Sequence, residues 1–382
     1  PDKVLRVGLV SADFDRHPVG YLIEPLLAAA DPAEVHFVCY SGVGEEDDLS
    51  ARLKRRSAAW RSTLGMSDRA MADLVRADGI DILIDLAGHT AANRLPVFGL
   101  EPAPVQVSWI GYPCTTGLRA IGYALMDEAT VPAGAERWFV ERVVHLPETR
   151  FCYAPPEYAP PPGPPPMLAH GRVTFGSFNN LCKVTPEVVR LWARVLEAIP
   201  GARLILKWKT LADPETRARY RRWFAAEGTD PARVELRAAS PHPQMLAEYA
   251  DVDVALDPFP YSGGITTLEA LWQGVPIVTL PGMRPVSRQT LGFLRNLGRA
   301  EWVARDPDDY VRISVGLASD PQALAAIRRT QRARMAASPL CDAPRFARHF
   351  EAALRALWHD WCGTQPACTR HRERRGVEGA RQ

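Results

Sequence analysis

The sequence lacks the long apolar runs of membrane proteins. No run of about 18 consecutive apolar residues occurs, so a membrane-spanning helix is not expected. The first residues, Pro1 to Val4, carry neither the basic nor the apolar region of a secretory signal peptide. From these two absences we expect a soluble, cytoplasmic protein with no membrane partner.

Cysteine and net charge are also scarce. The seven cysteines include no C-x-x-C pair, which favours reduced core thiols over zinc ligands or disulfides. The formal net charge is only +2, and we expect no nucleic-acid partner. Arginines gather in residues 363–382, which are predicted to form a disordered tail whose charge is solvated.

What the first half does contain is a regular alternation of apolar runs and amphipathic stretches. With 382 residues, the chain exceeds what one core usually holds, so two domains are expected, the first over residues 1–154. Strand followed by helix, repeated, predicts a parallel sheet with right-handed crossovers. Strands are predicted at 4–11, 35–40, 81–87 and 105–111, and helices at 21–30 and 67–77.

Proline interrupts this alternation. Eight prolines between Pro155 and Pro166 exclude a helix or a central strand, so residues 155–170 are predicted to be an extended surface linker. A proline-rich ligand for another domain is the alternative. Residues 171–362 then form a second domain of the same kind, with C-terminal helices after residue 306. The predicted fold class is α/β, with two Rossmann-like, doubly wound domains that face each other across a cleft. Strands are predicted at 173–178, 202–208, 233–237, 252–257 and 276–280, and a helix at 186–199.

One strand of the second domain leads into a glycine-bearing loop and then a helix. Gly263 and Gly264 allow a ligand to approach the backbone, and Thr266 and Thr267 lie in the first turn of the helix. Unpaired amides at a helix N-terminus suit a diphosphate. Glu269, in the same helix, could accept hydrogen bonds from a ribose. An ordinary loop with a threonine cap is the alternative, because no Walker or GxGxxG spacing is present.

A lysine follows another strand of the second domain. Lys183 precedes a helix opened by Pro186, so its ammonium group is predicted to point from the loop into the cleft and to neutralise a diphosphate. A solvated surface lysine is the alternative.

Two histidines follow strands of the first domain. His17 and His89 are predicted at one edge of the sheet, facing the second domain, where an imidazole suits acid/base catalysis near neutral pH. A purely structural histidine is the alternative at each position.

The pair Asp251 and Asp253 has the D-x-D spacing with which some sugar transferases hold a metal. Asp253 leads directly into the apolar run VALD, so the pair is better explained as a helix end and a strand start. No metal site is predicted.

Five segments follow one another along the chain: DLAGHT, PAPVQVSWIGYP, FNNLCK, LDPFPY and EALWQGVPIVTLPG. In this order they resemble the catalytic region of the O-linked N-acetylglucosaminyltransferase family, glycosyltransferase family 41, with its bacterial and SPINDLY-like members. The resemblance runs from about Val4 to Trp361. It implies a GT-B fold and an inverting transfer, without metal or other cofactor, from a UDP-sugar to serine or threonine hydroxyls of proteins.

The resemblance also implies roles for individual residues. By position, Lys183 matches the lysine that contacts the donor diphosphate, and Asn180 lies at a nearby nucleotide-contacting position. The segment from Gly264 to Thr267 matches the phosphate loop. Glu269 matches the acidic residue near the ribose, and His17 matches the histidine beside the acceptor and the sugar.

The chain departs from the family pattern in this loop. Gly264, Ile265 and Thr266 stand where animal members have a histidine and two threonines, so a nucleobase contact is lost. UDP-N-acetylglucosamine is the expected donor, with GDP-fucose or UDP-glucose as alternatives. A non-catalytic nucleotide-sugar binding module is an alternative of another class. Relatives also carry N-terminal tetratricopeptide repeats that gather protein acceptors, and none is visible in this sequence.

Overall fold

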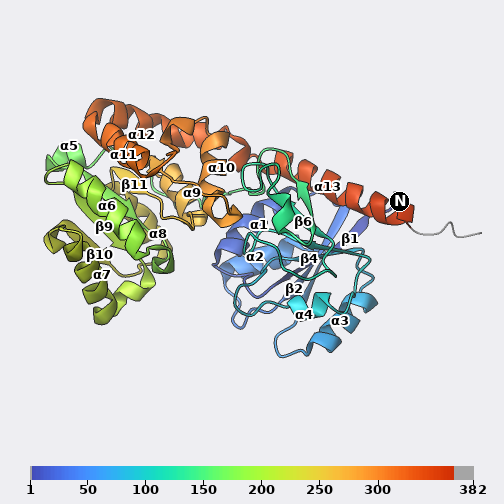
Figure 1. Cartoon of the computed structure of the whole chain (residues 1–382). Coiled ribbons are helices and arrows are strands. Elements are labelled where there is room, and N and C mark those ends of the chain that lie inside the picture. Colours follow the sequence, from blue (N-terminus) through green and yellow to red (C-terminus); the bar gives the residue numbers. More distant parts are fainter. Residues whose placement is uncertain (1, 365–382) are drawn as a thin grey trace, which may run out of the picture.

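Parallel strands build the first lobe, which lies on the right of Figure 1. The computed structural model describes residues 2–364, and the sheet of this lobe has the order β3-β2-β1-β4-β5-β6-β7. In β1 only Arg6 is partly exposed, as in parallel sheets that are covered on both faces. The elements are β1 (Leu5–Ser11), α1 (Pro18–Ala29), β2 (Val35–Ser41), α2 (Asp48–Arg56), β3 (Ala59–Ser62), α3 (Asp68–Ala77), β4 (Ile82–Asp85), α4 (Leu95–Phe98), β5 (Val105–Ser108), β6 (Tyr123–Met126) and β7 (Arg142–His145).

A second parallel sheet, of order β10-β9-β8-β11-β12, builds the other lobe. Its helix α6 shows how the sequence directs the fold: Thr185 caps the helix, Pro186 occupies the first turn, and the apolar stripe is buried. The elements are α5 (Met167–His170), β8 (Thr174–Ser177), α6 (Pro186–Ala198), β9 (Arg203–Lys207), α7 (Pro214–Ala226), β10 (Val234–Arg237), α8 (His242–Ala247), β11 (Val254–Leu256), α9 (Ile265–Trp272), β12 (Ile277–Val278), α10 (Gln289–Asn296), α11 (Pro307–Ser319), α12 (Pro321–Ala336) and α13 (Ala343–Thr364).

The predicted pair of parallel sheets is therefore confirmed. The sequence did not predict β3, β6 and β7, because each has only four residues and β3 and β7 are largely accessible, so they lack a long apolar run. Residues 109–111, which were predicted as strand, instead form a loop. Ile110 has a φ of 68°, and a Cβ on Gly111 would lie 2.5 Å from the carbonyl oxygen of Ala87. This loop therefore lies directly against the one that follows β4.

The last helix does not stay with the second sheet, to which the sequence assigned it. α13 packs against α1 and β5 of the first lobe, and Figure 1 shows it running along that lobe. Its buried Phe350 lies 4.5 Å from the ring of Trp109. The apolar face of α13 therefore covers the first sheet. The helix extends through Thr364, so the predicted tail does not begin at 363, and the rest of that prediction lies outside the described residues.

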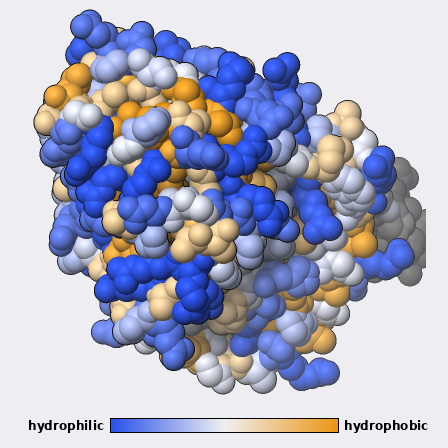
Figure 2. All heavy atoms as spheres, turned by 60° about the vertical axis from the view of Figure 1, so that its left-hand side comes forward, coloured by the Kyte–Doolittle hydropathy of each residue, from blue (hydrophilic) through white to orange (hydrophobic). Residues whose placement is uncertain are grey.

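The proline-rich connector lies against helix α12. Arg328 donates a hydrogen bond to the carbonyl oxygen of Gly163, and Arg332 donates one to that of Pro160. Residues 167–170 of the predicted linker form the short helix α5. On the face turned forward from the left of Figure 1, Figure 2 shows hydrophilic residues interspersed with smaller apolar groups.

Candidate active site

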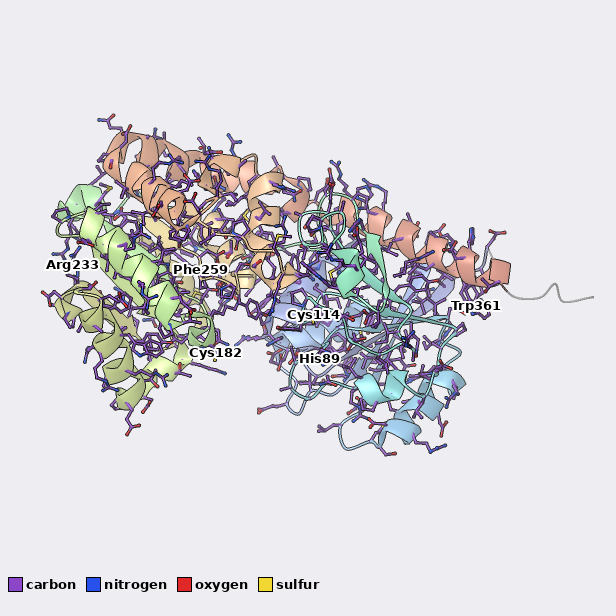
Figure 3. All side chains as sticks on the ribbon, in the orientation of Figure 1. His89, Cys114, Cys182, Arg233, Phe259 and Trp361 are labelled. Atoms are coloured by element: carbon purple, nitrogen blue, oxygen red, sulfur yellow. The ribbon has the colours of Figure 1, made fainter. Side chains whose placement is uncertain are left out.

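The loops at the carboxyl ends of the two sheets meet each other. Tyr112 follows β5 and Tyr261 follows β11, and their rings lie 6.0 Å apart in an edge-to-face arrangement. A second contact stacks Tyr21 of α1 on His242 of α8 at 5.4 Å. In Figure 3, His89 lies on the side of the first lobe that faces the second. Open α/β sheets bind ligands beyond the carboxyl ends of their strands, so this interface is the candidate site.

Lys183 contacts Tyr261, the residue of the second lobe that meets Tyr112 of the first. Its Nζ donates a 2.8 Å hydrogen bond to the carbonyl oxygen of Ser262 and lies 4.1 Å from the ring centre of Tyr261. Burial lowers the pKa of Lys183 to about 8, and the nearby Asp257 opposes that effect. Burial likewise raises the pKa of Asp257 to about 6. The structure thus brings Lys183 to the glycine loop, which is 79 residues away in sequence.

The glycine loop ends in free backbone donors. The amide of Gly263 donates to Asp257 at 2.7 Å. The amides of Gly264, Ile265 and Thr266 have no acceptor within the described part of the chain. Such groups at a helix N-terminus carry a partial positive charge that suits an anion. The loop therefore presents three donors beside the Lys183 ammonium group.

Other predicted donor-site residues have partners within the protein. Thr267 is fully buried, and its hydroxyl contacts that of Thr290 at 3.3 Å, so it faces away from the cleft. Asn180 caps the short 3-10 helix Leu181–Lys183 by accepting from the amide of Cys182 at 3.1 Å. Both residues shape the loops around Lys183.

Glu269 is buried and hydrogen-bonded to a histidine. Its Oε1 lies 2.7 Å from Nε2 of His242, whereas its Oε2 has no hydrogen-bond partner among the described residues. The hydroxyl of Tyr158 contacts Nδ1 of the same histidine at 2.6 Å. Burial raises the pKa of Glu269, and His242 opposes that effect. Glu269 therefore keeps one buried carboxylate oxygen without a hydrogen-bond partner in the described part of the chain.

A mainly apolar pocket opens next to His242 and Thr266. Its volume is about 250 Å³, and it lies beyond the carboxyl ends of β8, β9 and β10. A flat ring that entered it would meet Phe178, Trp208 and Met245. Apolar walls with a few polar groups at the rim are typical of nucleobase and other small-ligand sites.

His17 is placed at the N-terminus of α1. Its Nδ1 accepts a long 3.4 Å hydrogen bond from the amide of Val19 and lies 3.7 Å from a carboxylate oxygen of Asp13. The side chain is 42% exposed, so part of the ring is accessible to solvent. His17 therefore caps a helix, and its role in chemistry stays a prediction.

His89 is exposed, and no hydrogen bond or ion pair involves its side chain within residues 2–364. It follows Gly88, whose φ of 60° turns the chain directly after β4. Because β1 and β4 are neighbours in the sheet, His17 and His89 follow adjacent strands. Both residues therefore follow strands at one edge of the sheet, and within residues 2–364 no hydrogen bond or ring contact joins their side chains.

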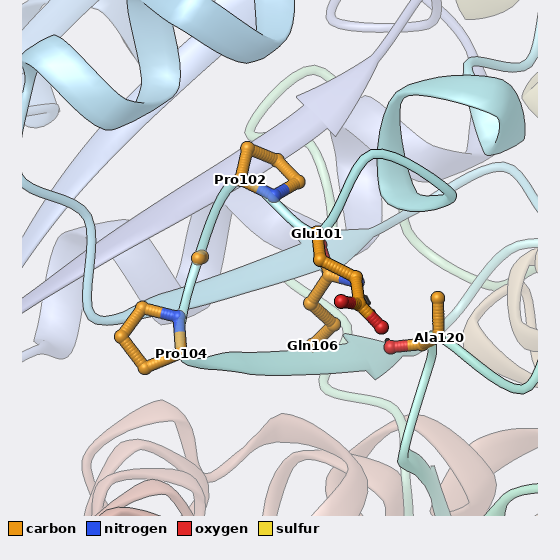
Figure 4. A pocket seen from close by; sticks show the side chains of 6 residues that line it. Glu101, Pro102, Pro104, Gln106 and Ala120 are labelled. Atoms are coloured by element: carbon orange, nitrogen blue, oxygen red, sulfur yellow. Dashed lines mark hydrogen bonds between the residues drawn. The ribbon is translucent and has the colours of Figure 1, made fainter.

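Another hollow lies at the opposite edge of the first sheet. It has a volume of about 480 Å³ and is lined by residues that precede or border the start of β5, among them Glu101 and Gln106 (Figure 4). Its position at the amino end of the strand separates it from the site described above.

The D-x-D pair has structural partners. Asp251 accepts a hydrogen bond from Arg237 at 2.6 Å, and Asp253 accepts from the amides of Met167 and Thr174. Among the described residues, no group of three histidine, cysteine or acidic side chains could hold a metal. In the same part of the chain, no helix is long and apolar enough to cross a bilayer.

Sequence reasoning missed several residues of the site. Asn179 accepts a hydrogen bond from the hydroxyl of Thr266 at 3.1 Å, and Asp257 holds Gly263. Trp208 and His242 border the apolar pocket. Asn179, Asp257 and Trp208 lie at or just beyond the end of a strand, so their position was the available signal, whereas the His242–Glu269 pairing required the fold.

Comparison with known sequences gives a consistent assignment. The sequence model of a family described as Glycosyl transferase family 41 matches residues 1–154 and 167–350. A Petunia hybrida protein named "Probable UDP-N-acetylglucosamine--peptide N-acetylglucosaminyltransferase SPINDLY" is 40% identical over 377 residues, covering 97% of this chain and 40% of that protein. An Arabidopsis thaliana protein of the same name is also 40% identical and is covered to 41%. The chain thus spans about two fifths of these relatives.

Solved structures agree with the sequence relatives. A mutant Thermobaculum terrenum O-GlcNAc transferase superposes with a TM-score of 0.91 and 40% identity, covering 95% of this chain and 69% of that one. The Anabaena protein HepE, in complex with UDP and glucose, superposes with a TM-score of 0.57 at 11% identity, which shows likeness of fold alone. The predicted GT-B arrangement of two Rossmann-like lobes is confirmed.

Proposed function

The chain belongs to glycosyl transferase family 41, and from that membership we propose that it transfers N-acetylglucosamine from UDP-N-acetylglucosamine to serine or threonine hydroxyls of proteins. We also propose that the transfer inverts the anomeric centre and needs no metal. The names of the SPINDLY relatives and of the bacterial O-GlcNAc transferase support the donor and the class of acceptor.

The observation that carries this proposal is the Lys183 ammonium group beside the free amides of Gly264, Ile265 and Thr266. In an inverting displacement, the acceptor oxygen attacks the anomeric carbon from the face opposite the diphosphate. The bond from that carbon to the diphosphate breaks, and negative charge builds on the leaving group. A preorganised cation and amide dipoles stabilise that charge where it develops, which is usually the largest single catalytic effect.

The nucleoside half of the donor fits the neighbouring features. The apolar pocket beside Trp208 would take the base, and the unpartnered Oε2 of Glu269 would accept from a ribose hydroxyl. His242 would orient that carboxylate through its 2.7 Å contact. Starting from the phosphate loop, the proposed order is diphosphate, ribose and base.

The acceptor hydroxyl must lose its proton during the transfer. We propose His17 as the base, with His89 as the second choice. When Nδ1 of His17 accepts from Val19, the ring proton is on Nε2. A proton on Nδ1 would instead face Asp13 and leave Nε2 free to accept the hydroxyl proton. Asp13 is therefore suited to select the tautomer that acts as a base.

A binding and transfer panel tests the proposal. Calorimetry with UDP, GDP and their sugars, with and without EDTA, is expected to show micromolar-range UDP binding that EDTA does not change. Transfer of labelled N-acetylglucosamine to protein is expected from UDP-N-acetylglucosamine, with UDP-glucose and GDP-fucose as comparison donors. Loss of binding in EDTA contradicts metal independence. UDP binding without transfer or hydrolysis identifies a binding module, and preference for GDP-fucose reassigns the donor.

A further inference from the structure

A fully buried arginine lies behind the phosphate loop. Arg150, between β7 and the proline connector, has 0% exposure. Its Nη2 donates a 3.1 Å hydrogen bond to Oε1 of Gln289, the first residue of α10. Its guanidinium carbon lies 4.1 Å from the ring centre of Phe151. This side chain has no part in the function derived so far.

The charge of Arg150 is not balanced by an ion pair. Its Nε and Nη1 have no hydrogen-bond partner within residues 2–364, and no carboxylate of that part lies within ion-pair distance. The nearby Asp127 instead accepts from the backbone amides of Thr130 and Arg150, at 2.7 and 2.9 Å. Burial of an unpaired charge is costly, so proteins rarely keep one without a compensating partner. Burial lowers the pKa of Arg150 to about 10, so the group remains a cation at neutral pH.

Gln289 links this cation to the phosphate loop. A methyl group placed on Gly264 would lie 3.9 Å from Oε1 of Gln289, the same atom that accepts from Arg150. The amide of Gln289 donates to Oγ of Ser262 at 3.2 Å, and the carbonyl oxygen of Ser262 accepts from Lys183. Lys183 therefore contacts this short segment directly, and Arg150 is linked to it through Gln289.

We propose that Arg150 is a second buried cation of the donor site, which acts through Gln289 to position the Ser262–Gly264 segment and to attract the diphosphate of the nucleotide sugar. This inference rests on the proposed function. Asp127 partly offsets the charge of Arg150 from a distance, and a diphosphate bound at the loop would add a second negative charge near it. Arg150 is a positioning residue, because its guanidinium contacts Gln289 and does not line the apolar pocket beside His242 and Thr266. Buried charges are screened less by salt than exposed ones, so its effect on an anion persists at physiological ionic strength.

The test compares a charged ligand with its uncharged counterpart. Calorimetry measures the affinity of the full chain for UDP and for uridine, in the unaltered protein, Arg150→Met and Arg150→Lys. Arg150→Met is expected to weaken UDP binding by about tenfold and uridine binding by less than about twofold, since only UDP carries the diphosphate. Arg150→Lys is expected to restore most of the UDP affinity. Equal weakening of both ligands, or no weakening of UDP, overturns the inference.

Gln289→Glu serves as a second variant, since it keeps the size of the side chain and gives Arg150 a carboxylate partner. It is expected to raise the melting temperature, because the buried charge becomes paired, and to weaken UDP binding. Unchanged UDP affinity overturns the inference, whatever the melting temperature of the variant. This variant decides the matter if Arg150→Met does not fold.

The unaltered chain separates this inference from the proposed function. If it binds UDP no better than uridine, and GDP no better than guanosine, the phosphate site itself is wrong and the inference fails with it. If it prefers GDP, the same comparison is made with GDP and guanosine. If the unaltered chain binds the nucleoside diphosphate better than the nucleoside, and the variants show the same preference, only the role of Arg150 is overturned.

Discussion

Nζ of Lys183 and the carbonyl oxygen of Ser262 lie 2.8 Å apart, and this hydrogen bond joins the loop after β8 to the loop after β11. Because β8 and β11 are neighbouring parallel strands, their carboxyl ends bring the two loops together. The ammonium group is thereby fixed next to the unpaired amides that open α9. A cation held by the fold loses little freedom when an anion binds, which makes this residue the first to test.

Replacing Lys183 with alanine removes the cation assigned to the leaving diphosphate. The expected loss of transition-state stabilisation is about 2 to 4 kcal/mol in kcat/KM, with the fold intact. Initial rates over a range of donor concentrations give kcat and kcat/KM, and a thermal melt checks the fold. Lys54→Ala is the matched control, because Lys54 is half-exposed on α2 of the other lobe and pairs with Glu46, and neither residue contacts Lys183 or the phosphate loop. A Lys183→Ala rate within a few-fold of the unaltered chain removes Lys183 from the mechanism.

The pH dependence of donor binding follows from the same lysine. Its pKa is lowered from 10.5 to about 8, so it is a cation below pH 8 and becomes neutral above it. UDP affinity is expected to fall as pH rises above 8, approaching about tenfold per pH unit, the limit for linkage to one proton. Calorimetry between pH 7 and 9.5 measures this fall, and Lys183→Arg is expected to abolish it because arginine stays charged.

Stability should change in the opposite direction in this pH range. Between about pH 8 and 10.5 the unfolded chain binds more protons at Lys183 than the folded chain, so the contribution of this residue to the free energy of unfolding rises with pH. Denaturant titrations of the unaltered chain and Lys183→Met isolate that contribution. Equal pH slopes for the two proteins would contradict the low pKa.

Alanine substitutions at the adjacent Gly263 and Gly264 form a matched pair that tests the packing of the phosphate loop. A Cβ on Gly263 would lie 2.1 Å from Oγ1 of the buried Thr267, whereas a Cβ on Gly264 would lie 3.9 Å from Oε1 of Gln289. Gly263→Ala is therefore expected to cost about 1 to 3 kcal/mol of stability and to weaken UDP binding. Gly264→Ala should leave the melting temperature nearly unchanged. Thermal melts of both variants check the difference, and equal stability would show that the loop adjusts freely.

The sequence predicted the two sheets because parallel strands covered on both faces must be apolar throughout. It could not assign α13, since the contact of Phe350 with Trp109 joins positions 241 residues apart and no local pattern records it. The cap and proline that begin α6 are local signals and were readable. Contacts between residues that are distant in sequence form when the helices and sheets pack together, and a single sequence does not show which residues will meet.

The candidate site also contains residues that local sequence patterns indicate and residues that only the fold brings together. Lys183 and the glycine loop were identified because glycines, hydroxyls and a lysine after strands suggest a phosphate site. The inward orientation of Thr267 and the pairing of Glu269 with His242 depend on which side of α9 is buried. Arg150 gave no signal, because an arginine in an apolar segment shows its burial only in the folded chain.

His17 is expected to act on the acceptor side of the cleft. It lies at the start of α1 in the first lobe, whereas Lys183 and the phosphate loop belong to the second, so its loss should slow transfer far more than it weakens UDP binding. Replacing His17 with alanine would remove two things together, a candidate base and a helix cap. Loss of a cap alone costs about 0.5 to 2 kcal/mol of stability, so the alanine variant cannot separate the two roles.

His17→Asn separates the role of helix cap from the role of base. The side-chain oxygen of asparagine can accept a hydrogen bond from the amide of Val19, as Nδ1 of His17 does. Asparagine cannot take up a proton near neutral pH. His17→Asn is expected to keep the melting temperature and UDP affinity and to lower the transfer rate by about a hundredfold or more, the usual effect of losing a general base. Asp13→Asn should lower the rate by a smaller factor, since it removes the charge that favours the proton on Nδ1. Melting temperature, UDP affinity and initial rate are measured on each variant. If His17→Asn transfers sugar as fast as the unaltered chain, His17 is only a cap and His89→Asn becomes the variant to examine.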